Sequence, residues 1–187
     1  MPVVEHQPDD DKLRELILLI ARDSEGDSPF GATKLNKLLF FADFLAYRQF
    51  GKPITAQEYM RLPNGPAPRR MVRIAKGMES TGQIAISERL YFGKPQKVLK
   101  ALREPNLDRF SAREIDLVNT LIRQCWGKNA TEMSASSHRF MGWRLAGEKE
   151  TIPYSVALVS RGPRTEAAER HAAALVEKAQ DAMKRGA

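Results

Sequence analysis

One segment limits the possible folds more than any other. Residues 33–50, TKLNKLLFFADFLAYRQF, place apolar side chains at helical spacing. One face carries Leu35, Leu38, Leu39, Ala42, Leu45 and Ala46, and the apolar surface is extended around the helix by Phe40, Phe41 and Phe44. A helix that is apolar over most of its circumference lies inside a core, so we predict a central helix here. Asp43, within this helix, must be exposed or paired, and we expect an ion pair with an arginine.

The rest of the pattern predicts a mainly α fold, a single compact helical domain with one small β-hairpin. An α+β arrangement in which the hairpin forms a wing is the variant. We expect an acidic tail over residues 1–9, the domain over 10–160, and an alanine-rich helix over 161–187. Periodicity and capping boxes predict the elements, which are helices at 10–23, 33–50, 56–61, 69–80, 111–126 and from 129, and a hairpin of 84–91 with 96–102.

Charge is divided unevenly along the chain, whose formal net charge is +7. Residues 1–27 contain eight acidic and three basic side chains, whereas residues 69–103 contain nine basic and two acidic ones. Such a basic segment attracts a polyanion or an acidic protein, although it can equally be a solvated face. A helix followed by a basic hairpin resembles a winged DNA-binding regulator, and its candidate nucleic-acid contacts are Arg73, Lys94, Lys97 and Lys100.

Motifs for catalysis or metal binding are missing from the sequence. The single cysteine and the three separated histidines have no zinc spacing, and there is no phosphate-binding loop, dinucleotide motif or HExxH. We therefore expect no cofactor, no metal and no enzymatic activity. Ser137 and His138 have no identifiable acid partner, so we expect His138 to be a hydrogen-bonding partner packed near Trp143. We expect both Trp126 and Trp143 to be core residues. The acidic start does not resemble a signal peptide, and no run of eighteen apolar residues occurs, so we expect a cytoplasmic protein without membrane contact.

A rigid loop, RLPNGPAPRRM at residues 61–71, interrupts the helical pattern. Its three prolines fix backbone angles, and Asn64-Gly65 supplies a turn. A stiff loop loses little entropy on binding, so it suits a partner-binding surface. The residues that we predict for this surface are Tyr59, Pro63, Asn64, Gly65, Pro66, Arg69 and Arg70. The alternative is a loop that only connects two helices.

Two segments resemble a known family. TKLNKLLFFADFLAYRQFGKPITAQEYMRLPNGPAP is similar to the signature half of the Panacea domain, a SocA-like antitoxin domain of phage-associated proteins. MSASSHRFMGWRLAGEKETIPY resembles the second cluster of that family, a Ser-His followed by Trp and Ile-Pro-Tyr. Asn64 departs from the aromatic residue that commonly precedes the Gly-Pro turn.

The resemblance implies an antitoxin or adaptor-like module that neutralises a cognate toxin by binding it, without catalysis. The toxin is then the expected partner, and a protease is a second candidate partner if the protein acts as an adaptor. Antitoxins frequently bind their own promoter DNA, so the regulator interpretation remains open beside this one.

Overall fold

The computed structural model describes residues 6–159, which form a mainly α fold, as the sequence predicts. The predicted helix at 161–187 lies outside the described residues. The helices within 6–159 are α1 Asp10–Asp23, α2 Ala32–Phe50, α3 Met71–Ser80, α4 Ala112–Cys125, α5 Ala130–His138, α6 Met141–Leu145 and α7 Val156–Val159, with a 3-10 turn, η1, at Leu107–Arg109. The strands are β1 Tyr59–Met60, β2 Ala67–Pro68, β3 Ile84–Tyr91, β4 Lys94–Ala101 and β5 Thr151–Ile152.

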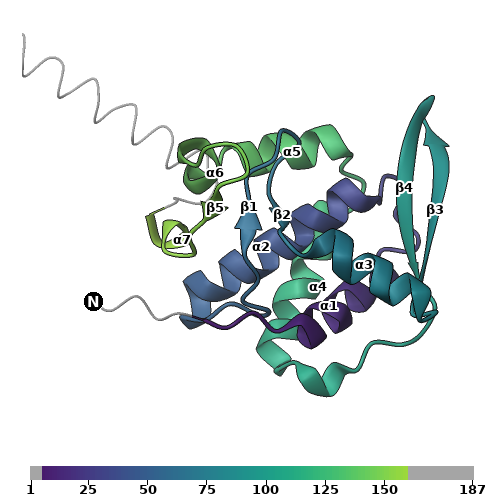
Figure 1. Cartoon of the computed structure of the whole chain (residues 1–187), viewed down its shortest axis with the longest axis horizontal. Coiled ribbons are helices and arrows are strands. Elements are labelled where there is room, and N and C mark those ends of the chain that lie inside the picture. Colours follow the sequence, from purple (N-terminus) through teal and green to yellow (C-terminus); the bar gives the residue numbers. More distant parts are fainter. Residues whose placement is uncertain (1–5, 160–187) are drawn as a thin grey trace, which may run out of the picture.

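Helix α2 is central, as its apolar pattern predicts (Figure 1). It contacts α1, α4, α5, α7, β2 and β4. Leu35, Leu39 and Phe40 are completely buried. The helix ends at Gly51, whose left-handed backbone (φ 76°) suits a residue without a Cβ. The other segments are therefore arranged around this helix.

Side-chain caps set the start of several helices. Asp9 accepts a hydrogen bond from the backbone of Lys12 at the start of α1. Ser111 with Glu114 and Asn129 with Glu132 form complete capping boxes at α4 and α5. These three predicted helices are confirmed.

The predicted short helix at 56–61 is wrong. The Thr55 hydroxyl and backbone N–H, which should cap that helix, both donate to Asp43 instead. Ala56 then takes a positive φ of 54°, and Tyr59–Met60 pairs as a strand with β2 on one side and β5 on the other. A buried carboxylate that needs donors therefore overrides the local capping pattern.

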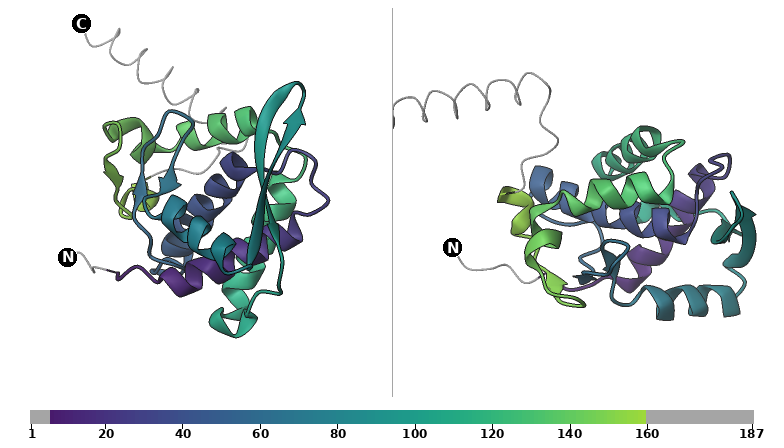
Figure 2. Two further views of the ribbon diagram at one scale, coloured as in Figure 1. Left: turned by 45° about the vertical axis from the view of Figure 1, so that its right-hand side comes forward. Right: turned by 90° about the horizontal axis from the view of Figure 1, so that it is seen from above.

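The predicted hairpin is present as β3 and β4, which pair from Ile84↔Ala101 to Tyr91↔Lys94. Its turn is Phe92-Gly93, shorter than the connection over 92–95 that the predicted strands leave, so Lys94 and Pro95 belong to the strand. The outer end of the hairpin extends beyond the helices (Figures 1 and 2). Among the described helices, none is both long enough and apolar enough to cross a membrane.

Candidate partner-binding surface

The proline-rich loop leaves β1, contains β2 at the edge of a small sheet of order β2-β1-β5, and leads into α3. Its exposed residues are Pro63, Asn64, Arg69 and Arg70, and we call these four the loop surface. Tyr59, Gly65 and Pro66 are buried, so these three predicted residues lie beneath the loop surface and support it.

Side chains from three helices hold the main chain of the loop. Trp143 Nε1 donates to Leu62 O at 3.2 Å, and Ser134 Oγ donates to Asn64 O at 3.0 Å. Lys37 Nζ, from α2, donates to Pro66 O at 3.4 Å. Within the loop, the Gly65 N–H donates to Leu62 O at 2.8 Å. Both the prolines and these bonds therefore fix the loop conformation.

Gly65 is required by its position. Its φ is 97°, and a Cβ there would overlap Lys37 Cε and lie 2.5 Å from Ser137 Oγ. Only glycine allows the loop to approach α2 and α5 so closely.

The two arginines of the loop surface are exposed and already have partners. Arg69 Nε lies 3.2 Å from Glu58, and Arg69 Nη2 donates to Lys149 O at 3.1 Å and to Thr151 Oγ1 at 3.0 Å. Arg70 pairs with Asp10 at 3.3 Å. Pairs this exposed contribute little to stability, so a partner protein can exchange them for its own carboxylates.

Below the loop, aromatic rings from both ends of the domain pack together. Tyr59 lies edge-on to Phe40 and Phe44, and Phe44 also contacts Phe140 and Tyr154 at centroid distances of 5.4 and 4.6 Å. Phe40 and Phe44 come from α2, whereas Phe140 and Tyr154 lie about a hundred positions later. This cluster joins the two segments of the sequence that flank the loop.

Asp43 organises the same region through hydrogen bonds, and the expected ion pair with an arginine is wrong. Its carboxylate accepts from Thr55 N at 2.6 Å, from Thr55 Oγ1 at 2.5 Å and from the Tyr59 hydroxyl at 2.8 Å. Burial raises the pKa of Asp43, and these three donors oppose that rise. Burial and the Asp43 charge raise the pKa of Tyr59, which therefore remains a hydrogen-bond donor.

Comparison with protein families identifies the domain. The family model described as "Antitoxin SocA-like, Panacea domain" matches residues 35–144, more than half of the chain. The chain belongs to this family. Neither the curated proteins nor the solved structures give a significant match. The matched range runs from α2 into α6, so the Panacea domain of this chain contains the loop surface, the hairpin and most of the aromatic cluster.

Two lysines of α2 are buried, a feature that the sequence pattern does not predict. Lys34 is 1% exposed, and its Nζ bonds Asp27 at 2.5 Å, Cys125 O at 2.5 Å and Lys128 O at 2.9 Å. Lys37 is 2% exposed, and its one hydrogen bond to the described residues is the long one to Pro66 O. Burial lowers the pKa of Lys37 to about 8. The lysine spacing, i and i+3 within an apolar helix, was the available signal.

Lys37→Met should raise the free energy of unfolding at pH 7 by about 1–3 kcal/mol, because it removes a buried and poorly paired charge. The pKa of Lys37 in the folded protein, about 8, lies below the reference value of 10.5. Between these values the unfolded chain binds more protons, so the wild type gains stability as pH rises. The variant should lack that gain, which urea unfolding across this pH range measures.

Lys76→Met is the matched control, because Lys76 is exposed. It should leave both the stability and its pH dependence near the wild-type values. A Lys37→Met variant that is less stable than wild type at pH 7 would show that the bond to Pro66 outweighs the cost of burial.

His138 and Trp143 also support the loop of the Panacea domain. Their rings stack at 3.7 Å, and the Arg61 guanidinium lies 4.6 Å from the Trp143 ring centroid. Burial, followed by the Lys37 and Arg61 charges, lowers the pKa of His138. The expected contact of His138 with Trp143 is present. Trp126, however, is half exposed, so its predicted core position is wrong.

The acidic amino-terminal region neutralises much of the basic segment. Asp10 pairs with Arg70 at 3.3 Å and with Arg73 at 2.8 Å. Glu15 pairs with Arg103 at 2.7 Å. Lys100 pairs with Glu25 at 3.0 Å. Of the four predicted nucleic-acid contacts, Arg73 and Lys100 are therefore engaged. Lys94 and Lys97 form no ion pair with any residue in 6–159.

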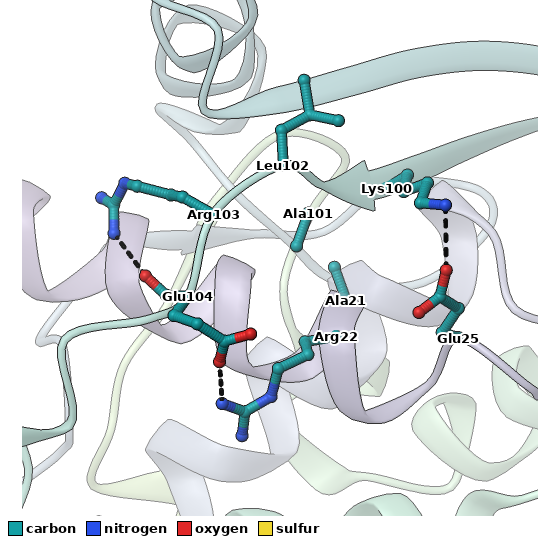
Figure 3. A pocket seen from close by; sticks show the side chains of 8 residues that line it. All are labelled: Ala21, Arg22, Glu25, Lys100, Ala101, Leu102, Arg103 and Glu104. Atoms are coloured by element: carbon teal, nitrogen blue, oxygen red, sulfur yellow. Dashed lines mark hydrogen bonds and ion pairs between the residues drawn. The ribbon is translucent and has the colours of Figure 1, made fainter.

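A pocket lies between the end of α1 and the end of β4 (Figure 3). Its charged side chains bond one another, as the Arg22–Glu104 and Lys100–Glu25 pairs show. These groups satisfy each other, so the pocket offers little to select a ligand. Across residues 6–159 no three His, Cys, Asp or Glu side chains are grouped as a metal site requires.

Proposed function

We propose that this protein is an antitoxin that neutralises a cognate toxin by direct protein–protein binding, and that it acts as a binding module without catalysis. Membership of an antitoxin-like family supports a general role of this type. The braced loop surface is the observation that carries the binding mechanism, because Pro63, Asn64, Arg69 and Arg70 are exposed on a main chain held by α2, α5 and α6. A surface fixed in advance loses little entropy when a partner binds.

The chemistry of the loop surface favours an acidic partner. Arg69 and Arg70 are both exposed. Arg69 is held by the exposed Glu58 and by backbone and hydroxyl oxygens, and Arg70 by the partly buried Asp10. Charges at the edge of an interface steer association and fix its orientation, and they contribute less to affinity. We therefore assign recognition of acidic side chains on the toxin to the two arginines, and shape recognition to Pro63 and Asn64.

Reversing both charges, Arg69→Glu with Arg70→Glu, should abolish protection against the toxin in a co-expression assay. The toxin candidate is the protein encoded beside this gene, and the readout is growth at equal soluble abundance of the antitoxin. The association rate should fall at least about tenfold, because repulsion replaces steering. Thermal unfolding should change only modestly, because the lost ion pairs are exposed.

A matched control reverses Arg113 and Arg123 on α4, which are also exposed and give the same change in net charge. The control should protect cells as the wild type does. Full protection by the folded Arg69/Arg70 variant would remove the loop surface from the interface and leave it as a connection between strands.

DNA binding is the second candidate function, and the observation that favours it is the projecting hairpin, whose Lys94 and Lys97 form no ion pair within residues 6–159. Three other basic side chains of the segment, Arg70, Arg73 and Arg103, are less favourable for DNA because they already pair with carboxylates of α1. An adaptor role toward a protease requires the same first step, the binding of a partner protein.

A further inference from the structure

Two side chains near the outer end of the β3–β4 hairpin anchor it to the backbone of residues 28–30. Arg89 Nη2 donates to Ser28 O at 2.5 Å and to Phe30 O at 3.1 Å, and Gln96 Nε2 donates to Pro29 O at 3.0 Å. Arg89 and Gln96 also face each other across the strands and are joined by a hydrogen bond of 2.9 Å. Beyond this anchored pair lie residues 90–95, which we call the hairpin tip.

The hairpin tip is apolar and exposed. Phe92 is 89% exposed and Leu90 is 75% exposed, and Tyr91 lies edge-on to Phe92 at 4.8 Å. Single exposed apolar residues are common in soluble proteins, so exposure alone carries no function. The exposed Leu90 and Phe92, with the partly buried Tyr91 between them, form an apolar projection at the end of an anchored hairpin.

The backbone of Phe92 gives a second and independent indication. Phe92 has a φ of 48° and Gly93 a φ of 74°, the two positive angles of a two-residue hairpin turn. Asn or Gly is strongly preferred at the first of these positions, and a bulky side chain there is strained. Phenylalanine at this position is unfavourable for folding and buries almost none of its own surface, so a role outside the folded chain accounts for it best.

Charges beside the tip indicate what kind of partner it fits. Lys94 lies directly after the turn, and Lys97 faces Glu88 across the strands. Within the described part of the chain neither lysine forms an ion pair. Arg89, Lys94 and Lys97 outnumber Glu88, so the region around the tip is net positive. Complementarity then requires a negative rim on the partner.

We propose that the hairpin tip is a second docking element, in which Phe92 and Leu90 enter an apolar pocket with an acidic rim on the toxin. This assignment rests on the proposed antitoxin function and adds a contact separate from the loop surface. A protein pocket is favoured over DNA because Arg70 and Arg73, at the start of α3, and Arg103, after β4, already pair with carboxylates of α1. Aromatic side chains that fill such pockets commonly dominate the binding energy.

Phe92→Asn tests the assignment with opposite effects on folding and on binding. Asparagine suits the turn, so the melting temperature should equal or exceed that of the wild type. Binding to the purified product of the adjacent gene, measured by titration calorimetry, should weaken at least about tenfold. Lys94→Glu with Lys97→Glu should slow association and reduce its dependence on salt.

A matched pair of leucines controls for the loss of exposed apolar surface. Leu90 and Leu145 are each 75% exposed, on the hairpin and on α6 respectively. Leu90→Thr should weaken binding, and Leu145→Thr should not. Wild-type affinity in both Phe92→Asn and Leu90→Thr would overturn the hairpin assignment while leaving the antitoxin function in place.

The remaining outcomes are also decisive. If the wild type neither binds the adjacent gene product nor protects against it, the proposed function fails and the hairpin assignment fails with it. Binding of the wild type to duplex DNA from its own upstream region, lost in Phe92→Asn, would overturn the assignment in favour of nucleic acid. A wild-type dimer that Phe92→Asn dissociates would overturn it in favour of a second copy of this chain.

Discussion

Lys34→Met is expected to lower the free energy of unfolding by about 3–5 kcal/mol, the usual cost of removing one partner of a buried ion pair. The variant would leave the buried Asp27 carboxylate with the Gly127 N–H as its remaining bond among the described residues. The carbonyls of Cys125 and Lys128 would also lose their shared donor. Urea unfolding at pH 7, followed by circular dichroism, measures the change.

Lys37→Met, one helical turn later, is the internal comparison for this experiment. Both substitutions remove a buried lysine from α2, and their expected effects have opposite signs because the two ammonium groups differ in their partners. In an Asp27→Asn background, the cost of Lys34→Met should fall, because the charge left behind is gone. Equal losses in both backgrounds would show that the pair contributes through packing alone.

Asp43→Ala should cost about 3 kcal/mol or more, because three buried donors lose their acceptor and each such donor costs about 1–3 kcal/mol. The donors are the Thr55 N–H, the Thr55 hydroxyl and the Tyr59 hydroxyl. Since Tyr59 lies at the start of β1, directly before the loop surface, the variant should also loosen that surface. Hydrogen exchange of the amides in residues 59–70 provides the second measurement, beside thermal unfolding.

Tyr59→Phe and Thr55→Val remove one side-chain donor each and should cost about 1–2 kcal/mol. Asp43→Ala should then cost less in the Tyr59→Phe protein than in the wild type, because one donor is already absent. A strictly additive result would mean that Asp43 and Tyr59 act independently despite their 2.8 Å contact.

Elements with strong local signals could be predicted from the sequence. The capping residues of α4 and α5 and the apolar circumference of α2 set those helices correctly. The prediction of a helix at 56–61 was wrong because the Thr55 hydroxyl donates to the Asp43 carboxylate on α2. The local sequence pattern does not indicate that long-range hydrogen bond. The hairpin turn was also misplaced, because Phe92 occupies the first position of a two-residue turn, where Asn, Asp or Gly is preferred.

The candidate site was harder to predict from the sequence than the fold. Its exposed residues, Pro63, Asn64, Arg69 and Arg70, followed from loop chemistry. The burial of Tyr59 did not, because one of the rings around it comes from Tyr154, far along the chain. The pairing of Arg70 and Arg73 with Asp10 also joins charges that lie far apart in the sequence, so a count of basic residues overstated what is left for a partner.

The brace of the loop surface has a consequence for protein synthesis. Ser134, Trp143 and Thr151 contact Asn64, Leu62 and Arg69 across separations of 70, 81 and 82 residues. The ribosome therefore releases the loop long before it releases the residues that fix it. A nascent or prematurely ended chain would carry every exposed residue of the surface without its shape. Under the proposed function, a chain should therefore bind its toxin only once synthesis has passed Thr151.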